Sequence, residues 1–184
     1  EENLKVEGVA TKRAVKQPKN EQIEDVSPKQ AFRSAFFSGY NEYQVYVRTW
    51  DKVDKPKGVL LVIHGMVEHG LRYDDFAQYM NKNGYIVVAP DLRGHGKTAG
   101  APENVCKYDG DIFADTVRDC VKLADALIQK YKLPLFVLGH SYGSFITQSF
   151  IQNYHKHRAA ILSGSCCFKG DVQVALGKMV ANLT

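Results

Sequence analysis

The chain has 184 residues, of which 45% are hydrophobic and 24% charged, and its formal net charge is +4. This length and balance suit one globular domain with a sizeable core, and the mild charge gives no clustered basic face of the kind that nucleic-acid binding requires. The four cysteines lack the C-x-x-C spacing of a zinc site, so we predict no metal and expect a reducing, cytoplasmic setting.

The first thirty residues are polar, with six Lys or Arg and six Asp or Glu, and they show no sustained hydrophobic period. We interpret residues 1–30 as an amino-terminal extension and residues 31–167 as the folded core. No signal-peptide pattern opens the chain. Because the chain begins with Glu1 rather than Met, the removal of a leader stays open.

The core is predicted to begin with a β-hairpin. In "FFSGYNEYQVYVRTW", residues 36–50, apolar and polar side chains alternate around a Gly-Tyr-Asn turn. One side of the second strand carries Tyr43, Val45 and Val47, and the other carries Gln44, Tyr46 and Arg48.

Strands and helices then alternate along the rest of the chain. Continuous apolar runs predict buried strands, and apolar residues spaced three and four apart predict helices. This alternation predicts an α/β fold with a mostly parallel sheet, right-handed crossovers and helices on both faces. The expected strands are 58–63, 85–92, 133–141 and 159–165, and the expected helices are 73–84, 111–131 and 142–154.

The stretch "LGHSYGSF", residues 138–145, lies where a predicted strand ends and a helix begins. In such sheets, ligands bind beyond the carboxyl ends of the strands. Ser141 stands between Gly139 and Gly143, and a turn this sharp needs small neighbours and leaves the serine strained and exposed. The helix that starts at Tyr142 directs free N–H groups toward the same place. We therefore predict that Ser141 is a nucleophile.

A G-x-S-x-G pattern at a strand-to-helix junction resembles the nucleophile elbow of the α/β-hydrolase fold. Two further stretches, "HGMVEHGLRY" at 64–73 and "DLRGHGKTAG" at 91–100, are similar to segments of monoacylglycerol lipases and lysophospholipases, which are serine aminopeptidase-like hydrolases. The three motifs stand in the order that this family has. The resemblance implies a serine hydrolase of lipid-like carboxylic esters, without a cofactor, that contacts membranes or lipid aggregates transiently.

The resemblance also implies roles for the residues around Ser141. The main-chain N–H groups of Met66 and Tyr142 would hold the oxyanion, so that their side chains are free to vary. Other positions would support the loops beside the nucleophile rather than act chemically. These supporting positions are His64, Gly65, Glu68, His69, Asp91, Arg93, His95, Gly139, His140 and Gly143.

A serine hydrolase of this fold also needs an acid and a histidine that follow the serine in the chain. Asp171 is the only acid after Ser141, and no histidine follows His157. His155 and His157 come after the helix that Ser141 opens, about 21 Å away along its axis, which is too far to reach the serine. His95 stays open as a geometric candidate for the base. We therefore expect the triad acid and histidine to be absent from this chain.

Two interpretations of this absence compete. We favour an amino-terminal part of a longer hydrolase, in which residues 168–184 begin a cap region and later strands are missing; alone, such a chain would be nearly inactive. The alternative is a complete binding module without catalysis.

The reaction class is predicted more firmly than the substrate, because peptidases and other acyl hydrolases share this framework. A dehalogenase would have Asp in place of Ser141. The stretch "GHGKT" at 94–98 imitates the end of a phosphate-binding loop, but Asp91 stands where that motif requires glycine. We therefore do not expect nucleotide binding.

Overall fold

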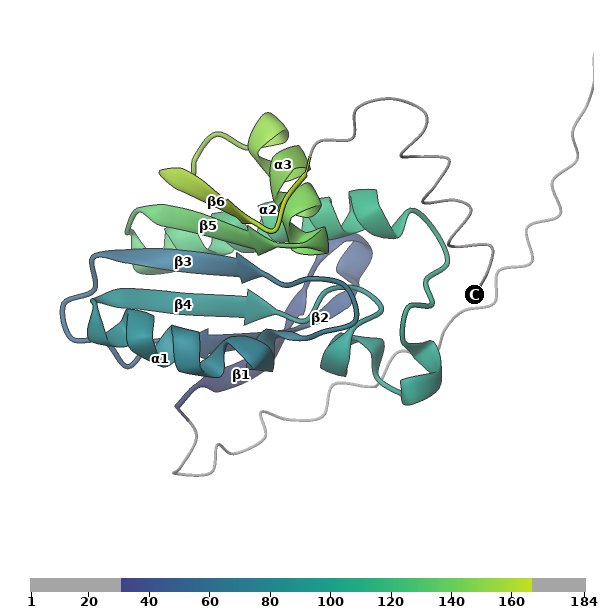
Figure 1. Ribbon diagram of the computed structural model, residues 1–184, viewed down its shortest axis with the longest axis horizontal. Coiled ribbons are helices and arrows are strands. Elements are labelled where there is room, and N and C mark those ends of the chain that lie inside the picture. The colour runs from purple at the N-terminus through teal and green to yellow at the C-terminus, as the bar shows by residue number, and fades with distance from the viewer. Residues whose placement is uncertain (1–30, 167–184) are drawn as a thin grey trace, which may run out of the picture.

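The computed structural model describes residues 31–166. The predicted extension 1–30 and the predicted cap segment 168–184 lie outside these residues. The described part contains a six-stranded sheet of order β1-β2-β4-β3-β5-β6, with helices on both of its faces (Figure 1). The mostly parallel α/β architecture expected from the alternating pattern is thereby confirmed.

The amino-terminal hairpin forms the antiparallel part of the sheet. β1 (Arg33–Ser38) pairs with β2 (Gln44–Trp50), and a short 3₁₀ turn, η1 (Tyr40–Glu42), joins them. β2 then lies antiparallel to β4 (Tyr85–Pro90), which fixes the hairpin to the rest of the sheet.

The hairpin is confirmed, and both sides of its second strand, β2, carry buried residues. Tyr46 and Arg48 are 7% and 4% exposed, and are therefore buried like Val45 and Val47 on the other side. The Arg48 guanidinium lies 4.7 Å from the centre of the Tyr46 ring and forms an ion pair with Asp91. The buried Asp91 carboxylate therefore compensates the charge of Arg48 on this side of β2.

The parallel part of the sheet agrees with the predicted strands to within two residues at each end. β3 (Gly58–Ile63) lies between β4 and β5 (Leu135–His140), and β6 (Ala159–Ser163) pairs with β5. All six residues of β3 are buried, as expected of a central strand that is covered on both faces.

The two faces of β3 contribute to two separate cores. Leu60 and Val62 pack in a cluster with Ala77 of α1 (Asp74–Lys82). Leu61 and Ile63 pack in a larger cluster beneath α2 (Ile112–Tyr131) and α3 (Tyr142–Asn153). Because side chains alternate along a strand, one short apolar run supplies both cores.

The loops that carry the predicted motifs gather at one edge of the sheet. β3, β4 and β5 are parallel, so their carboxyl ends meet there, at the right of Figure 1. The loop after β3 leads into η2 (Gly70–Tyr73), and the loop after β4 leads into η3 (Gly96–Ala99) and then η4 (Pro102–Asn104). The chain after β5 turns directly into α3.

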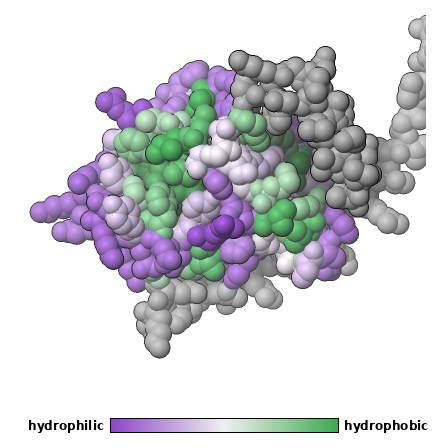
Figure 2. Space-filling view, viewed as in Figure 1, coloured by the Kyte–Doolittle hydropathy of each residue, from purple (hydrophilic) through white to green (hydrophobic). Residues whose placement is uncertain are grey.

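Among residues 31–166, none of the helices has the length and apolar character needed to span a bilayer. On the face shown in Figure 2, apolar side chains form patches bordered by hydrophilic ones.

Candidate functional site

Ser141 occupies the turn between β5 and α3 in a conformation that non-glycine residues rarely adopt. Its φ is 50° and its ψ is −119°, and it forms the N-cap of α3. Its amide donates a hydrogen bond to the Ser163 carbonyl at 2.9 Å, which ties the turn to β6. The side chain is exposed. The predicted sharp turn is therefore present. Backbone strain of this kind persists only where the surrounding contacts enforce it.

The neighbouring glycines are required by close backbone contacts. A Cβ atom at Gly143 would overlap the carbonyl oxygens of Ile63 and His64 at the end of β3. A Cβ atom at Gly139 would overlap the Thr147 hydroxyl and the Gly143 carbonyl. The G-x-S-x-G spacing thus lets α3 start against the carboxyl end of β3.

The loop after β3 lies beside Ser141. A Cβ atom built at Gly65 would lie 3.2 Å from the Ser141 Cβ. Met66 follows Gly65, and its amide takes part in no backbone hydrogen bond within residues 31–166. The amide of Tyr142, the first residue of α3, has no carbonyl four residues earlier within the helix to accept its hydrogen bond. Both predicted oxyanion donors therefore come from segments that flank Ser141, while their catalytic role stays a prediction.

Glu68 closes the loop after β3 on itself. Its Oε1 accepts hydrogen bonds from the Gly65 amide and, at 3.1 Å, from the Tyr73 hydroxyl, and its Oε2 pairs with Arg72 at 3.2 Å. Between these anchors, Val67 has a φ of 56°, which is strained for a β-branched residue. Glu68 therefore supports the loop through its own side chain, which contacts residues at both ends of the segment 65–73.

His64 joins the loop after β3 to the loop after β4. Its Nε2 accepts a hydrogen bond from the Leu92 amide at 3.0 Å, and its Nδ1 lies 2.7 Å from the Gly65 carbonyl. These contacts fit a neutral ring that donates from Nδ1. Burial, reinforced by the nearby His95, lowers the pKa of His64 to about 4, which keeps the ring neutral near pH 7.

Asp91 holds both loops from a fully buried position. Its Oδ1 accepts hydrogen bonds from Arg48 at 2.5 Å and from the Gly70 amide at 2.8 Å, and its Oδ2 accepts one from the Lys97 amide at 2.8 Å. Sequence reasoning assigned no role to Arg48. The available signal was an arginine within a strand, "VYVRTW", whose other residues are apolar or aromatic except for one threonine.

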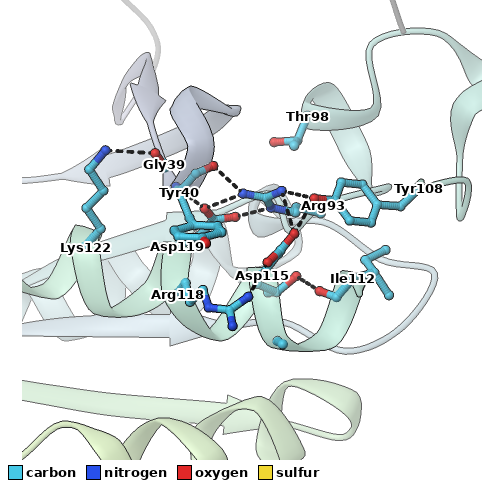
Figure 3. A network of polar contacts seen from close by, with 12 residues as sticks. Gly39, Tyr40, Arg93, Thr98, Tyr108, Ile112, Asp115, Arg118, Asp119 and Lys122 are labelled. Atoms are coloured by element: carbon cyan, nitrogen blue, oxygen red, sulfur yellow. Dashed lines mark hydrogen bonds and ion pairs between the residues drawn. The ribbon is translucent and has the colours of Figure 1, made fainter. Parts of the chain in front are cut away.

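Arg93 anchors the loop after β4 to α2 and to the hairpin turn (Figure 3). It forms an ion pair with Asp119 at 2.6 Å and donates to the Tyr40 carbonyl at 2.7 Å. It also donates to the Tyr108 hydroxyl, and its guanidinium lies 4.3 Å from the centre of the Tyr43 ring. These contacts connect the loop after β4 to α2, to the hairpin turn and to Tyr108.

The predicted site histidines occupy different surroundings. His95 is 4% exposed, its Nδ1 lies 2.8 Å from the Arg93 carbonyl, and its Nε2 has no hydrogen-bond partner among the described residues. His69 is exposed and, with His95, lines a groove of about 330 Å³ beside the loop after β3. His140 points to β6, where its Nδ1 lies 3.2 Å from the Ser163 hydroxyl.

None of the six histidines of the chain forms a hydrogen bond with the Ser141 hydroxyl within residues 31–166. His155 and His157 follow the end of α3, at the opposite end of that helix from Ser141. The described residues therefore provide a candidate nucleophile, Ser141, and two candidate oxyanion donors, with no histidine hydrogen-bonded to the Ser141 hydroxyl.

Comparison with known proteins finds one matching family and relatives that are named as lipases. The family described as "Serine aminopeptidase, S33" matches residues 54–183. A monoacylglycerol lipase of Mycolicibacterium smegmatis is 32% identical over 152 residues, covering 80% of this chain and 53% of that protein. The monoglyceride lipase of Homo sapiens is 35% identical over 103 residues, covering 55% of this chain and 32% of that protein.

Among solved structures, a thermostable carboxyl esterase from Bacillus coagulans superposes with a TM-score of 0.70 and 28% identity. The match covers 84% of this chain and 51% of that one. The chain thus spans between about a third and about half of the length of these relatives.

Proposed function

This chain belongs to the serine aminopeptidase S33 family of α/β-hydrolases, and we propose that the natural protein containing it hydrolyses carboxylic esters through Ser141. The observation that carries this proposal is the strained turn at Ser141, with a φ of 50°, beside the Gly65 loop. That conformation presents a hydroxyl at the carboxyl edge of the sheet. The ester-hydrolase relatives support the same reaction class.

In the proposed mechanism, the Ser141 oxygen attacks the acyl carbonyl carbon. Its proton passes to a histidine supplied by polypeptide outside these 184 residues, oriented by an acid that is also outside them. The Met66 and Tyr142 amides stabilise the negative oxygen, and each such donor is worth about 3–4 kcal/mol in the transition state. The alcohol leaves with the returned proton, and water then hydrolyses the acyl-enzyme.

The substrate that we propose is a lipid-like ester. Met66 and Val67, in the loop next to Ser141, are 57% and 75% exposed, and this apolar surface suits an acyl chain or a lipid aggregate. The names of the monoacylglycerol lipase relatives support this choice. The family description favours a second candidate, a peptidase that cleaves an amide by the same acyl-enzyme route.

A fluorophosphonate probe tests the nucleophile in the natural protein. We expect covalent labelling of the wild type and none of Ser141→Ala. Ser149→Ala, in the same helix, is the matched control and should label as the wild type does. Equal labelling of Ser141→Ala, or no labelling of the wild type, would reject the proposal and favour a binding module.

A panel of chromogenic substrates tests the class of substrate. We expect p-nitrophenyl esters of medium and long acyl chains to be cleaved at least about tenfold faster, by kcat/KM, than aminoacyl p-nitroanilides. The reverse order would replace the esterase by the peptidase. Ser141→Ala should abolish whichever activity is found.

A further inference from the structure

Arg48 lies in β2, remote from Ser141 in sequence, yet it contacts the residue that holds the loop after β3. We propose that Arg48 is a positioning residue for the oxyanion: through Asp91, it keeps the 64–70 loop aligned with Ser141. This inference rests on the proposed function and assigns a residue that the motifs do not contain.

The first step of the argument is the set of contacts around Asp91. One carboxylate oxygen is shared by Arg48 and the Gly70 amide, and the other oxygen accepts the Lys97 amide. Asp91 is 0% exposed and Arg48 is 4% exposed. The carboxylate therefore links β2 to both loops at the carboxyl edge of the sheet.

The second step is the charge balance. A carboxylate that is buried from solvent is costly unless a positive charge compensates it. Arg48 brings that charge within 2.5 Å of Asp91, and its guanidinium is held over the Tyr46 ring at 4.7 Å. Without Arg48, the buried carboxylate would lose its compensating charge and one of its three hydrogen-bond donors. The remaining hydrogen bonds to the Gly70 and Lys97 amides would then rearrange.

The third step connects Gly70 to the oxyanion. The 64–70 loop is anchored near its start, where Glu68 accepts the Gly65 amide, and at its end, where Asp91 accepts the Gly70 amide. Met66 lies between these anchors, next to the strained Val67. Releasing one anchor lets the Met66 amide move relative to Ser141, and catalysis is sensitive to shifts of about 1 Å.

The test uses the natural protein with Arg48→Met, Arg48→Lys and, as a control, Trp50→Phe. Trp50 lies two residues along the same strand, is fully buried and donates a hydrogen bond to Asp74 at 2.7 Å, away from Asp91. Ester hydrolysis, fluorophosphonate labelling rate and thermal unfolding are measured for each variant, and rates are expressed per folded molecule.

We expect Arg48→Met to lower kcat and the labelling rate by about 10- to 100-fold with KM within about threefold, because a transition-state contact is lost. Arg48→Lys keeps the charge and should recover part of kcat. Trp50→Phe should lower the unfolding temperature without changing kcat. Amide exchange at Gly70 and Lys97 should become faster in Arg48→Met and not in Trp50→Phe.

If the wild type cleaves esters and is labelled, the proposed function stands, and three results would still overturn the positioning role of Arg48. These are an unchanged kcat in both Arg48 variants, an equal loss of kcat in Trp50→Phe, and unchanged exchange at Gly70 and Lys97. Arg48→Lys retains the buried charge, so the comparison stands even if Arg48→Met does not fold. A wild type that neither cleaves esters nor labels would instead overturn the proposed function, and this inference with it.

Discussion

The rings of His64 and His95 lie edge to face, with centroids 5.3 Å apart and planes inclined by 65°. Both are buried, one at the end of β3 and the other in the loop after β4. The hydrogen bond from the Leu92 amide to His64 crosses the same boundary. This contact joins the two motif-bearing loops through closely packed imidazoles.

Acidic pH should lower the stability of the folded protein through His64, whose ring connects the two loops. The pKa of His64 falls from 6.5 to about 4 in the folded protein because the ring is buried. Between these two values the unfolded chain binds more protons, so stability is complete above about pH 6.5 and decreases as the pH falls toward 4. His64 alone should contribute a loss of roughly 2–3 kcal/mol near pH 4.5.

Urea unfolding of the wild type and of His64→Gln at several pH values measures this contribution. The variant should be less stable at neutral pH, and its stability should fall less steeply between about pH 6.5 and pH 4. Parallel pH profiles for the two proteins would contradict the assignment.

Replacing Ser141 by glycine should stabilise the fold while removing the nucleophile. The φ of 50° with ψ of −119° is accessible to glycine without a Cβ clash, so Ser141→Gly should gain about 1 kcal/mol. Ser141→Ala keeps the strain and should gain nothing comparable. Chemical denaturation of the two variants decides the matter, and equal stabilities would show that the turn is not strained.

Adding a methyl group at Gly143 should disrupt the contact between α3 and β3. Because the new Cβ would overlap the Ile63 carbonyl, Gly143→Ala should cost about 2–4 kcal/mol. Ser149→Ala, in the same helix, should cost less than about 1 kcal/mol. Denaturant midpoints with matched slopes measure both, and a fully stable Gly143→Ala would refute the close approach.

Cys120 should be protected from thiol reagents until the protein unfolds. It is 1% exposed, and burial raises the pKa of its thiol far above the ordinary value, so the reactive thiolate is scarce. A variant that keeps only Cys120, with Ser at 106, 166 and 167, should react with Ellman's reagent more than about 100-fold faster in denaturant than in native buffer. Similar rates in both conditions would show that this face of α2 is open.

The order of strands and helices could be predicted because it rests on local patterns. Apolar runs identified β3 and β4, and the spacing of Val117, Ala124 and Ile128 identified α2, which packs these residues against the core. The turn at Ser141 was predicted by the same logic, because two glycines around a serine at a strand end leave few backbone conformations.

The surroundings of Arg48 and His95 could not be predicted in this way. Alternation along β2 placed Arg48 on a polar face, and only the packing of β2 against β4 and the following loop buries it beside Asp91. His95 was considered as a possible base, whereas the fold turns its Nδ1 to the Arg93 carbonyl and its ring to His64. Long-range packing decided both environments.

The sequence by itself determined the parallel α/β sheet, the sharp turn at Ser141 and the identity of the loops that flank it. These features depend on residues within a few positions of one another, where hydrophobic periodicity and glycine geometry act directly. Only the tertiary structure decided that a buried arginine from the hairpin stabilises the carboxylate that holds two of those loops. This contact joins two segments that are 43 residues apart in the chain. The desolvation penalty of the two charges and their mutual attraction both arise only when folding buries them side by side.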